Sequence, residues 1–324
     1  MVVHVNVPVV PGEETGEIPK MPLERDEKSI FNYGVCDPLW DIDTLPLTYN
    51  DSRWFAFIFE ADEGDLKRVT PRPLEVVGNR VEWWYVVHLV TRLGPYYEFG
   101  VTVPCIYRAP DGTVYKGGYY PYMYLTAAAP TDAGRVLGFP KKHAYIMAME
   151  QGGDLRNPPH KKYYFNTLIA RNGYIMHTAT GKYDDKVKAK DIAPVFWGDP
   201  EQGRFNMKIV SNSDITQTKW ELTYLPATVE GKMRFALKPE TIRTASPDAI
   251  NWFGQGTPFD NMCTMVPPKK LLGLVTFTFD LIIPVGQVLW TETRYRTPTD
   301  VAAACLAKPY RYHMRQQFPK PIGV

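Results

Sequence analysis

Residues 81–107 read VEWWYVVHLVTRLGPYYEFGVTVPCIY, and this stretch decides the fold class. Two runs rich in aromatic and β-branched residues, Val81–Thr91 and Tyr97–Tyr107, flank a short segment that contains Gly94 and Pro95. Runs of this length and composition, bounded by turn-forming residues, are typical of β-strands. The stretch therefore predicts two strands joined by a turn.

Similar runs recur along the chain from about Thr48 onwards. Turn-forming residues separate them, as in Ala109-Pro110-Asp111-Gly112 and Arg171-Asn172-Gly173. About eleven strands with few long helical patterns predict a β-rich α+β fold, a mainly antiparallel sheet closed into a barrel, with few short helices. The expected strands are Trp54–Glu60, Val81–Thr91, Tyr97–Tyr107, Tyr119–Ala127, Ala144–Glu150, Tyr163–Ala170, Tyr174–Thr180, Asn206–Ser211, Thr216–Tyr224, Arg234–Lys238 and Leu274–Ile283.

Three short helices are expected among these strands. Glu60–Val69 can form one or two turns before Pro71, which stops a helix. Pro247–Phe253 is a second candidate, and Val301–Lys308, with Asp300 as its N-cap, is the third.

Residues 1–48 differ in composition from the remainder of the chain. They contain six prolines and a mixed-charge stretch at residues 24–28, with no sustained hydrophobic period. We therefore expect an extended N-terminal arm over residues 1–48. Residues 49–324 show no internal repeat and no linker, so they are expected to form a single domain.

The charge balance excludes several classes of function. The chain has 37 Lys and Arg against 35 Asp and Glu, a formal net charge of +2. This balance argues against a protein built around nucleic acid or an anionic membrane. No apolar run approaches the ~18–20 residues of a spanning helix, and the N-terminus has no basic residue before its apolar stretch. A cytoplasmic protein is expected.

Neither the cysteines nor the histidines have the spacing of a metal site. Cys36, Cys105, Cys263 and Cys305 are far apart in the sequence and form no Cys-x-x-Cys motif. The six histidines likewise lack the spacing of metal ligands. Gly181-Lys182 lacks the upstream glycine of a phosphate loop. We therefore expect no metal and no organic cofactor.

A lysine doublet follows a proline in residues 134–143, GRVLGFPKKH. Pro140 favours extended backbone before it, so the lysines leave an extended or turn segment and not a helix. Successive side chains of an extended chain point to opposite faces, so Lys141 and Lys142 should diverge. The apolar run Ala144–Met149 that follows is suited to a core strand, and one lysine can therefore enter an apolar cavity.

Burial makes a lysine chemically useful. Desolvation disfavours the ammonium form, and lowering the usual pKa of ~10.4 by about 3 units leaves a large fraction of the amine neutral near pH 7. A neutral amine attacks a ketone and forms an imine. Taken alone, two lysines after a proline more often form a solvated turn. The surrounding sequence therefore has to show whether one of these lysines is buried and reactive.

The segment Gly138-Phe139-Pro140-Lys141-Lys142 resembles the Schiff-base lysine motif of the acetoacetate decarboxylase family. Acetoacetate decarboxylase is a standard example of an enzyme whose lysine is activated by its environment. The resemblance covers roughly residues 49–295 and rests on a series of segments in the family's order. They are Ser52–Phe55, Val69–Val76, Tyr97–Gly100, Val103-Pro104, Tyr122–Leu125, His177–Thr180, Asn206–Ile209 and Asp280–Pro284.

The resemblance implies roles for four residues. Lys141 would be the imine-forming nucleophile, and Lys142 its neighbour, whose charge should matter less than burial if it points away. Arg53 would orient a substrate carboxylate through a charge-assisted fork. Glu98 would position the substrate or handle a proton. Without the resemblance, Arg53 is a strand-end surface charge and Glu98 a buried structural acceptor, so both depend on lying next to Lys141.

Five further residues are expected to contact the substrate by their place in the resemblance: Phe139, Met123, Tyr122, Trp83 and Arg135. Two of them depart from the family pattern. Arg135 lies where the family usually has a glutamate, unless a one-residue deletion restores its Gly-Arg pair. Trp83 lies where some members have a second glutamate. These departures leave imine formation in place and put the protonation steps and the substrate in question.

The resemblance implies a lyase that decarboxylates a β-keto acid, acetoacetate or a larger one, through a lysine imine and an enamine. An alternative keeps the imine but carries out aldolase or dehydratase chemistry on a keto acid such as pyruvate. A third possibility is a small-molecule-binding member of the fold that has lost the chemistry. The implied partner is a keto-acid substrate, with no nucleic acid and no membrane, and the resemblance also implies a homo-oligomer.

Overall fold

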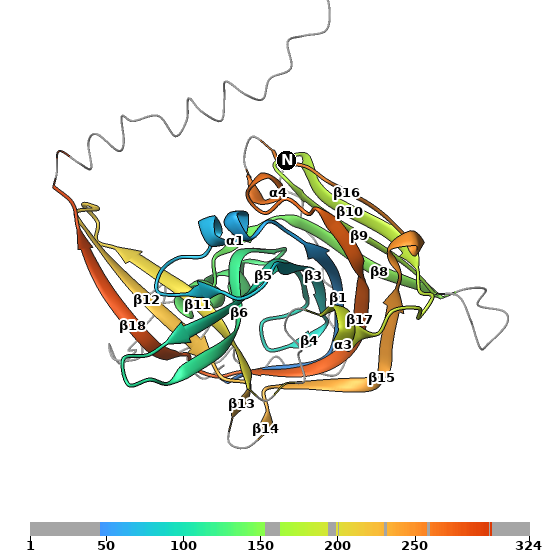
Figure 1. Ribbon diagram of the computed structural model, residues 1–324, viewed down its shortest axis with the longest axis horizontal. Coiled ribbons are helices and arrows are strands. Elements are labelled where there is room, and N and C mark those ends of the chain that lie inside the picture. The colour runs from blue at the N-terminus through green and yellow to red at the C-terminus, as the bar shows by residue number, and fades with distance from the viewer. Residues whose placement is uncertain are drawn as a thin grey trace, which may run out of the picture.

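A large β-sheet forms the body of the protein (Figure 1). The structure is a computed structural model that describes residues 46–152, 163–193, 199, 201–229, 232–257, 260–297 and 299. The sheet consists of β1 (Leu47–Glu60), β2 (Glu75–Val76), β3 (Arg80–His88), β4 (Val90–Thr91), β5 (Tyr96–Arg108), β6 (Val114–Leu125), β7 (Lys141–His143), β11 (Gln202–Ser211), β12 (Gln217–Leu225), β15 (Phe235–Ala245), β17 (Lys270–Ile283) and β18 (Gln287–Tyr295).

Most neighbours in this 12-stranded sheet are antiparallel. The strand order is β15-β17-β1-β3-β5-β6-β11-β12-β18, with β2 on β5, β4 on β1 and β7 on β6. Only the pairs β6–β11 and β6–β7 are parallel among the described strands. Both β7 and β11 therefore run alongside β6, which places the lysine doublet at the centre of the sheet.

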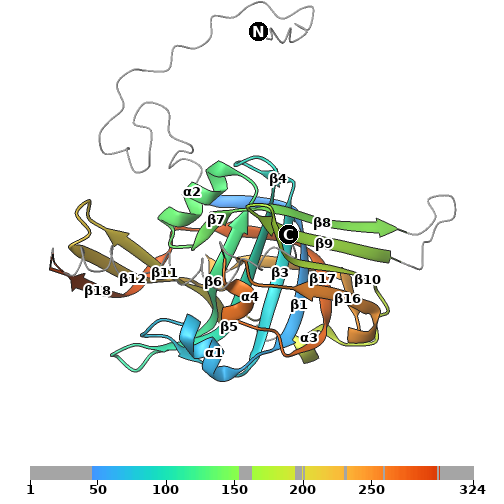
Figure 2. The ribbon, with the colours of Figure 1, turned by 90° about the horizontal axis from the view of Figure 1, so that it is seen from above.

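A second sheet of four strands lies beside the first, where β8 packs against β5 and β3 (Figure 2). Its order is β16-β10-β9-β8, and all its pairs are antiparallel. These strands are β8 (Tyr145–Gly152), β9 (Tyr163–Arg171), β10 (Tyr174–Lys182) and β16 (Ile250–Gly254). A separate two-stranded sheet pairs β13 (Thr228–Val229) with β14 (Lys232–Met233).

The helices are short. They are α1 (Glu63–Val69), α2 (Ala128–Val136), α3 (Ala189–Ile192), the 3-10 helix η3 (Pro247–Ala249) and α4 (Met262–Met265). Asp62 caps α1, since its carboxylate accepts hydrogen bonds from the backbone N–H groups of Gly64 and Asp65. Pro130 is tolerated in α2 because it lies in the first turn, where the helix needs no N–H donor.

The positions of the predicted strands are confirmed, but the predicted architecture needs one correction. All the expected strand runs fall on strands of the two sheets, and antiparallel pairing dominates. The prediction of a closed barrel is wrong, because the described strands form an open order with β15 and β18 at its ends. Closure depends on the stagger between the first and last strands, and the local pattern of residues does not encode that stagger.

Of the three predicted helices, one is confirmed, one is wrong and one lies outside the described residues. The helix expected at Glu60–Val69 is α1. The expected helix at Pro247–Phe253 is wrong: only its first three residues form η3, and Ile250 begins β16 because the run Ile250–Phe253 pairs with β10. The expected helix at Val301–Lys308 and the arm up to residue 45 lie outside the described residues.

The large sheet separates two buried clusters, because successive side chains of a strand point to opposite faces. One face contributes Trp83, Tyr85, Phe99 and Tyr124 to the first cluster. The other face contributes Trp54, Trp84, Val86 and Met123 to the second. The second face carries the candidate site.

Candidate active site

A cavity with about 490 Å³ of empty space, part of it open to solvent, lies on the sheet face that carries Trp54, Trp84 and Met123. Its walls come from β1, β3, β5, β6, β7, β11, β12, β15 and β17. Most lining side chains are aromatic or aliphatic, and five are ionisable groups that are costly to bury: His88, Glu98, Lys141, Arg204 and Arg234. A mainly apolar lining with a few convergent ionisable groups is typical of a site for a small organic ligand.

Strand β7 delivers Lys141 to this cavity. It pairs in parallel with β6, so that Lys141 lies opposite Met123 and Lys142 opposite Tyr124. Arg135, in the last turn of α2, donates a hydrogen bond from Nε to the carbonyl oxygen of Lys141 at 2.9 Å. The end of α2 thereby fixes the backbone from which the lysine side chain projects.

Helix α2 also covers the lysine side chain. A Cβ added to Gly134 would lie 2.2 Å from Cδ and 2.8 Å from Nζ of Lys141. Real Cβ contacts do not come this close, so the lysine can occupy its position only because residue 134 is glycine. The Lys141 ammonium group also donates a hydrogen bond to the carbonyl oxygen of Pro130 in α2 at 3.3 Å.

Lys141 is 5% exposed, and its Nζ lies 3.5 Å from Oε1 of Glu98. The same nitrogen lies 5.2 Å from the centroid of the Phe139 ring. Burial lowers the pKa of Lys141, and the charge and hydrogen bond of Glu98 oppose this shift only in part. The environment therefore favours a neutral amine relative to a lysine in water.

Glu98 joins the amine to a second buried group. Burial raises the pKa of Glu98, and the nearby charge of Lys141 opposes the shift. His88 Nε2 lies 3.8 Å from Glu98 Oε2, and His88 Nδ1 lies 2.7 Å from Ser52 Oγ. Burial, followed by the charge of Lys141, lowers the pKa of His88 well below its usual value. The group thus presents an amine, a carboxyl group and a neutral imidazole in sequence.

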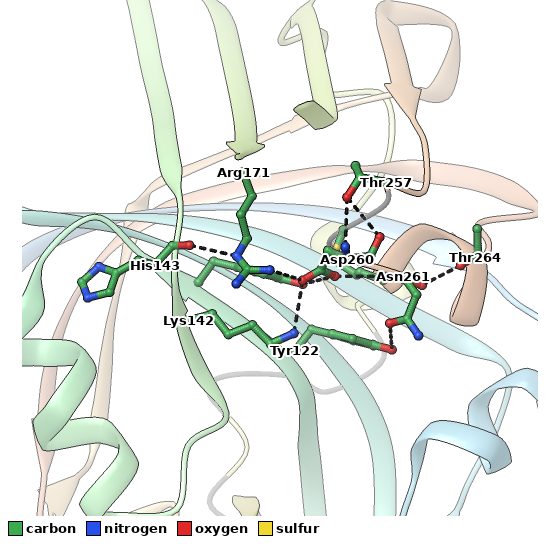
Figure 3. Close-up of polar contacts among 10 residues, drawn as sticks. Tyr122, Lys142, His143, Arg171, Thr257, Asp260, Asn261 and Thr264 are labelled. Carbon is green, nitrogen blue, oxygen red and sulfur yellow. Dashed lines mark hydrogen bonds and ion pairs between the residues drawn. The ribbon is translucent and has the colours of Figure 1, made fainter. Parts of the chain in front are cut away.

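The Lys142 side chain points to Asp260 (Figure 3) and does not line the cavity that Lys141 enters. Its Nζ is 3.1 Å from Oδ2 of Asp260, whose side chain has no exposed surface. The Arg171 guanidinium also contacts Asp260, at 3.4 Å, and Tyr124 donates a hydrogen bond to it at 2.5 Å. The prediction that the two lysines diverge is therefore confirmed by their positions.

Comparisons with known proteins identify the family of this chain. The acetoacetate decarboxylase (ADC) family profile matches residues 37–292, which is most of the chain. The chain belongs to the acetoacetate decarboxylase family. Acetoacetate decarboxylase 1 of Bradyrhizobium diazoefficiens is 30% identical over 278 residues, which cover 83% of this chain and 96% of that protein. The resemblance noted in the sequence is confirmed.

Solved structures of the acetoacetate decarboxylase fold match as well. The acetoacetate decarboxylase of Legionella pneumophila superposes with a TM-score of 0.60 at 20% identity, covering 76% of this chain and 88% of that one. The enduracididine biosynthesis enzyme MppR, complexed with pyruvate, superposes with a TM-score of 0.58 at 13% identity, covering 76% and 90%. At these identities the likeness shows a shared fold.

Among the residues that the family resemblance suggested, four line the cavity: Lys141, Glu98, Met123 and Phe139. Residues that line it and that the sequence did not suggest include His88, Tyr49, Arg204 and Arg234. His88, a polar residue that follows the apolar run Trp83–Val87 on β3, was the one local indication. The others reach the cavity through pairings between distant segments, which no local pattern reveals.

The structure places the other suggested residues elsewhere. Arg53 points away from the cavity that its neighbour Trp54 lines, and it forms an ion pair with Glu150 at 2.6 Å. Trp83 is fully buried in the cluster on the opposite face of the sheet.

Two of the suggested residues lie next to a lysine without lining the cavity. Tyr122 donates a hydrogen bond to Asn261 at 3.2 Å, and its ring centroid lies 5.7 Å from Nζ of Lys142. Arg135 holds the backbone of Lys141 instead of lining the cavity. These placements leave Lys142, Arg53, Trp83, Tyr122 and Arg135 outside the cavity wall.

Metal ligands and thiols are not part of this site. Within the described ranges, no group of three or more His, Cys, Asp or Glu side chains is arranged to hold a metal ion. Cys105 and Cys263 are buried free thiols, and burial raises the pKa of each to about 12. None of the described helices has the length and apolar character needed to cross a membrane.

Proposed function

We propose that this protein is a Schiff-base-forming carboxy-lyase that removes carbon dioxide from a β-keto acid, with Lys141 as the nucleophile. The observation that carries the proposal is the buried Lys141 amine, whose pKa is lowered beside Glu98 at the wall of a cavity. Family membership supports the same reaction, since the curated relatives are acetoacetate decarboxylases.

The proposed reaction begins with the neutral Nζ of Lys141. Its lone pair attacks the ketone carbon, and loss of water gives a protonated imine. The bond between the α-carbon and the carboxylate then breaks, and its electron pair moves toward the imine nitrogen, so that carbon dioxide leaves and a neutral enamine remains. A proton adds to the enamine carbon, and water hydrolyses the resulting imine to the ketone and the free amine.

Two neighbours of Lys141 fit the proton transfers of this sequence. Glu98 lies 3.5 Å from the amine and has a raised pKa, so it can carry the proton needed at oxygen during dehydration and at carbon afterwards. His88 adjoins Glu98 at 3.8 Å and remains neutral, so it can exchange a proton with the carboxyl group. The apolar walls disfavour charge, which speeds loss of a carboxylate as neutral carbon dioxide.

A second candidate uses the same imine for aldolase or dehydratase chemistry on a keto acid such as pyruvate. This chain shares its fold with MppR, whose structure was solved as a complex with pyruvate. That likeness supports testing the aldolase or dehydratase candidate. Arg135 and Trp83, where other members have acids, are the departures that keep a binding protein without chemistry as a third candidate. Evolved carbon dioxide separates the first candidate from the second, and a covalent adduct separates both from the third.

The test is reductive trapping. The protein is incubated with acetoacetate or a longer 3-oxo acid, sodium borohydride is added, and the modified peptide is identified by mass spectrometry while carbon dioxide is measured in parallel. We expect one substrate-dependent adduct on Lys141 together with carbon dioxide. An adduct without carbon dioxide, accompanied by aldehyde consumption, selects the aldol candidate. The absence of any adduct contradicts both enzymatic functions.

A further inference from the structure

The strand that carries the proposed nucleophile is short. β7 has three residues, Lys141–His143, and among the described strands it pairs with β6 alone. A strand of this length with a neighbour on one edge forms few ladder hydrogen bonds, so its pairing gives only weak control over the position of Lys141. Further contacts are therefore needed to hold the strand in place.

The backbone of β7 shows which of its groups face away from β6. Consecutive residues of a strand point their N–H and C=O groups to opposite edges. Ala144, directly after β7, donates its N–H to the carbonyl oxygen of Leu125 on β6 at 3.0 Å. Lys142 shares this edge by alternation. The carbonyl groups of Lys141 and His143 therefore face the outer edge, where no described strand pairs with β7.

Two arginine side chains bind these outer carbonyl groups. Nε of Arg135 donates to the carbonyl oxygen of Lys141 at 2.9 Å, and Nε of Arg171 donates to that of His143 at 3.2 Å. Arg135 comes from α2, whereas Arg171 ends β9 in the second sheet. Alternate carbonyl groups are the ones that a neighbouring strand would bind. The two guanidinium groups thus take the place of such a strand.

Asp260 fixes the position of Arg171. Nη1 of Arg171 lies 3.4 Å from Oδ2 of Asp260, whose side chain has no exposed surface (Figure 3). The same carboxylate accepts hydrogen bonds from the hydroxyl group of Tyr124 on β6, at 2.5 Å, and from the backbone N–H of Met262 at the start of α4, at 3.1 Å. The guanidinium group is planar and rigid. Its contact with a fixed carboxylate therefore also fixes the nitrogen that binds His143.

Lys142 contacts the same carboxylate but holds β7 less directly. Its side chain is 39% exposed and reaches Asp260 at the end of a flexible stem, at 3.1 Å. Loss of Lys142 would leave the outer carbonyl groups of β7 bound to both arginines. Loss of Arg171 would release the carbonyl group of His143 and one cation from Asp260. Arg171 is therefore the contact that joins the strand to the buried carboxylate.

We propose that Arg171 and Asp260 are positioning residues for the imine-forming amine: the carboxylate holds the guanidinium group, and the guanidinium group holds the strand that presents Lys141. This proposal rests on the proposed function and adds two residues that do not touch the substrate. The strand places Nζ of Lys141 3.5 Å from Oε1 of Glu98 and 3.3 Å from the carbonyl oxygen of Pro130. A displacement of about 1 Å from such a position costs roughly 10²-fold in rate.

The first test is kinetic and uses acetoacetate. Arg171→Met removes both contacts of the guanidinium group, so kcat for carbon dioxide release should fall by about 10²-fold. KM should change by less than about 3-fold, because Arg171 does not line the cavity. Arg171→Lys keeps the charge and loses the fork, so it should restore only part of kcat. Wild-type kcat in folded Arg171→Met would overturn the positioning role, and full rescue by lysine would overturn the bridging geometry.

The matched control is Lys238→Met. The Lys238 side chain is 30% exposed, close to the 25% of Arg171, and it pairs with Asp51 and Asp280 away from the cavity. Urea unfolding measures the stability of both variants, and near-UV circular dichroism confirms that they are folded at the assay temperature. We expect both to lose stability and only Arg171→Met to lose kcat. Equal losses of kcat would contradict the proposal.

A double-mutant cycle tests whether Asp260 acts through Arg171. Asp260→Asn keeps the size of the side chain and removes its charge. If both residues serve one function, the double variant with Arg171→Met should lose no more than about 3-fold beyond the larger single loss of kcat. Losses that multiply would contradict the role of Asp260. If Asp260→Asn does not fold, Arg171→Met, Arg171→Lys and Lys238→Met still decide the role of Arg171.

Hydrogen exchange gives a readout that does not depend on the chemistry. The amide of Ala144, which donates to Leu125 on β6, reports the pairing at the end of β7. Relative to the amides of β3, its protection should fall at least about 10-fold in Arg171→Met and stay unchanged in Lys238→Met. If wild-type protein gives neither carbon dioxide nor a trapped adduct, the proposed decarboxylation fails while this loss of protection still supports the positioning role. Unchanged protection in Arg171→Met overturns the positioning role whatever the activity.

Discussion

Lys141 and Lys142 are adjacent in the sequence, yet they experience opposite surroundings. The Lys141 side chain is 5% exposed, and the pKa of its amine is lowered by burial. The Lys142 side chain is 39% exposed and lies against the carboxylate of Asp260 on the other face of the sheet. The comparison teaches that the chemistry of a lysine in this protein is set by the face of the strand on which it lies.

The two faces of the sheet also differ in whether their ionisable groups are charged or driven toward neutral forms. On the Lys142 face, the buried carboxylate of Asp260 contacts the cations of Lys142 and Arg171, and both contacts stabilise its charge (Figure 3). On the Lys141 face, burial lowers the pKa of Lys141 and raises that of Glu98, so both groups are driven toward their neutral forms. A cluster of paired ions is suited to a structural role, and groups near neutrality are suited to nucleophilic attack and proton transfer.

The largest expected effect comes from removing each lysine in turn. Lys141→Ala should lower kcat/KM by at least about 10³-fold and abolish borohydride trapping, because Lys141 is the only lysine among the described residues that line the cavity. Lys142→Ala should lower it by less than about 10-fold and cost about 1 kcal/mol of stability, because it breaks a half-exposed ion pair. Steady-state kinetics and urea unfolding measure both. Comparable losses of activity in the two variants would contradict the division between faces.

A smaller effect is expected from crowding Lys141 without removing it. Gly134→Ala would place a methyl group 2.2 Å from Cδ of Lys141. The flexible lysine can yield, so stability should change little, but displacement of its amine by about 1 Å should cost roughly 10²-fold in kcat. Gly286→Ala is the control, since its added Cβ would lie 3.6 Å from its nearest neighbour. Wild-type activity in Gly134→Ala would show that α2 does not hold the amine in place.

The smallest effect concerns the pH dependence of the amine. In the folded protein the Glu98 charge and hydrogen bond raise the pKa of Lys141 against the effect of burial. Glu98→Gln removes this opposing influence, so the pKa of Lys141 should fall further, and the rise of amine reactivity with pH should shift to lower pH. The rate of acylation or borohydride trapping of Lys141, followed against pH, measures the shift.

Glu150→Gln serves as the control for that pH experiment, because Glu150 pairs with Arg53 outside the cavity and should leave the curve unchanged. A shift of the reactivity curve to higher pH would contradict the proposed relation between Glu98 and the amine.

The sequence predicted those parts of the fold that follow from local pattern. The runs of aromatic and β-branched residues identified the strands, and Pro140 with strand alternation predicted that Lys141 and Lys142 diverge. Helix α2 was not predicted, since Pro130 and Gly134 both indicate a break. The structure accommodates them because Pro130 lies in the first turn and Gly134 lies beneath Lys141.

The sequence did not predict which face of a strand turns inward. Arg53 and Trp54 alternate on β1, and it is Trp54 that lines the cavity. Strand alternation predicts that the two side chains lie on opposite faces of the sheet. It does not predict which face lines the cavity, because that depends on packing against distant strands. Arg204 and Arg234 reach the cavity in the same way, through β6–β11 pairing and the approach to β15, and no spacing near Lys141 indicates them.

The short strand β7 carries an evolutionary consequence. It has three residues and is held by its pairing with β6, so its register decides which lysine enters the cavity. An insertion or deletion of one residue between Arg135 and Pro140 that shifted this register would exchange the two side chains and bring Lys142 under α2. A lineage with a lysine doublet could therefore tolerate length changes in this loop while it still presented an amine to its substrate.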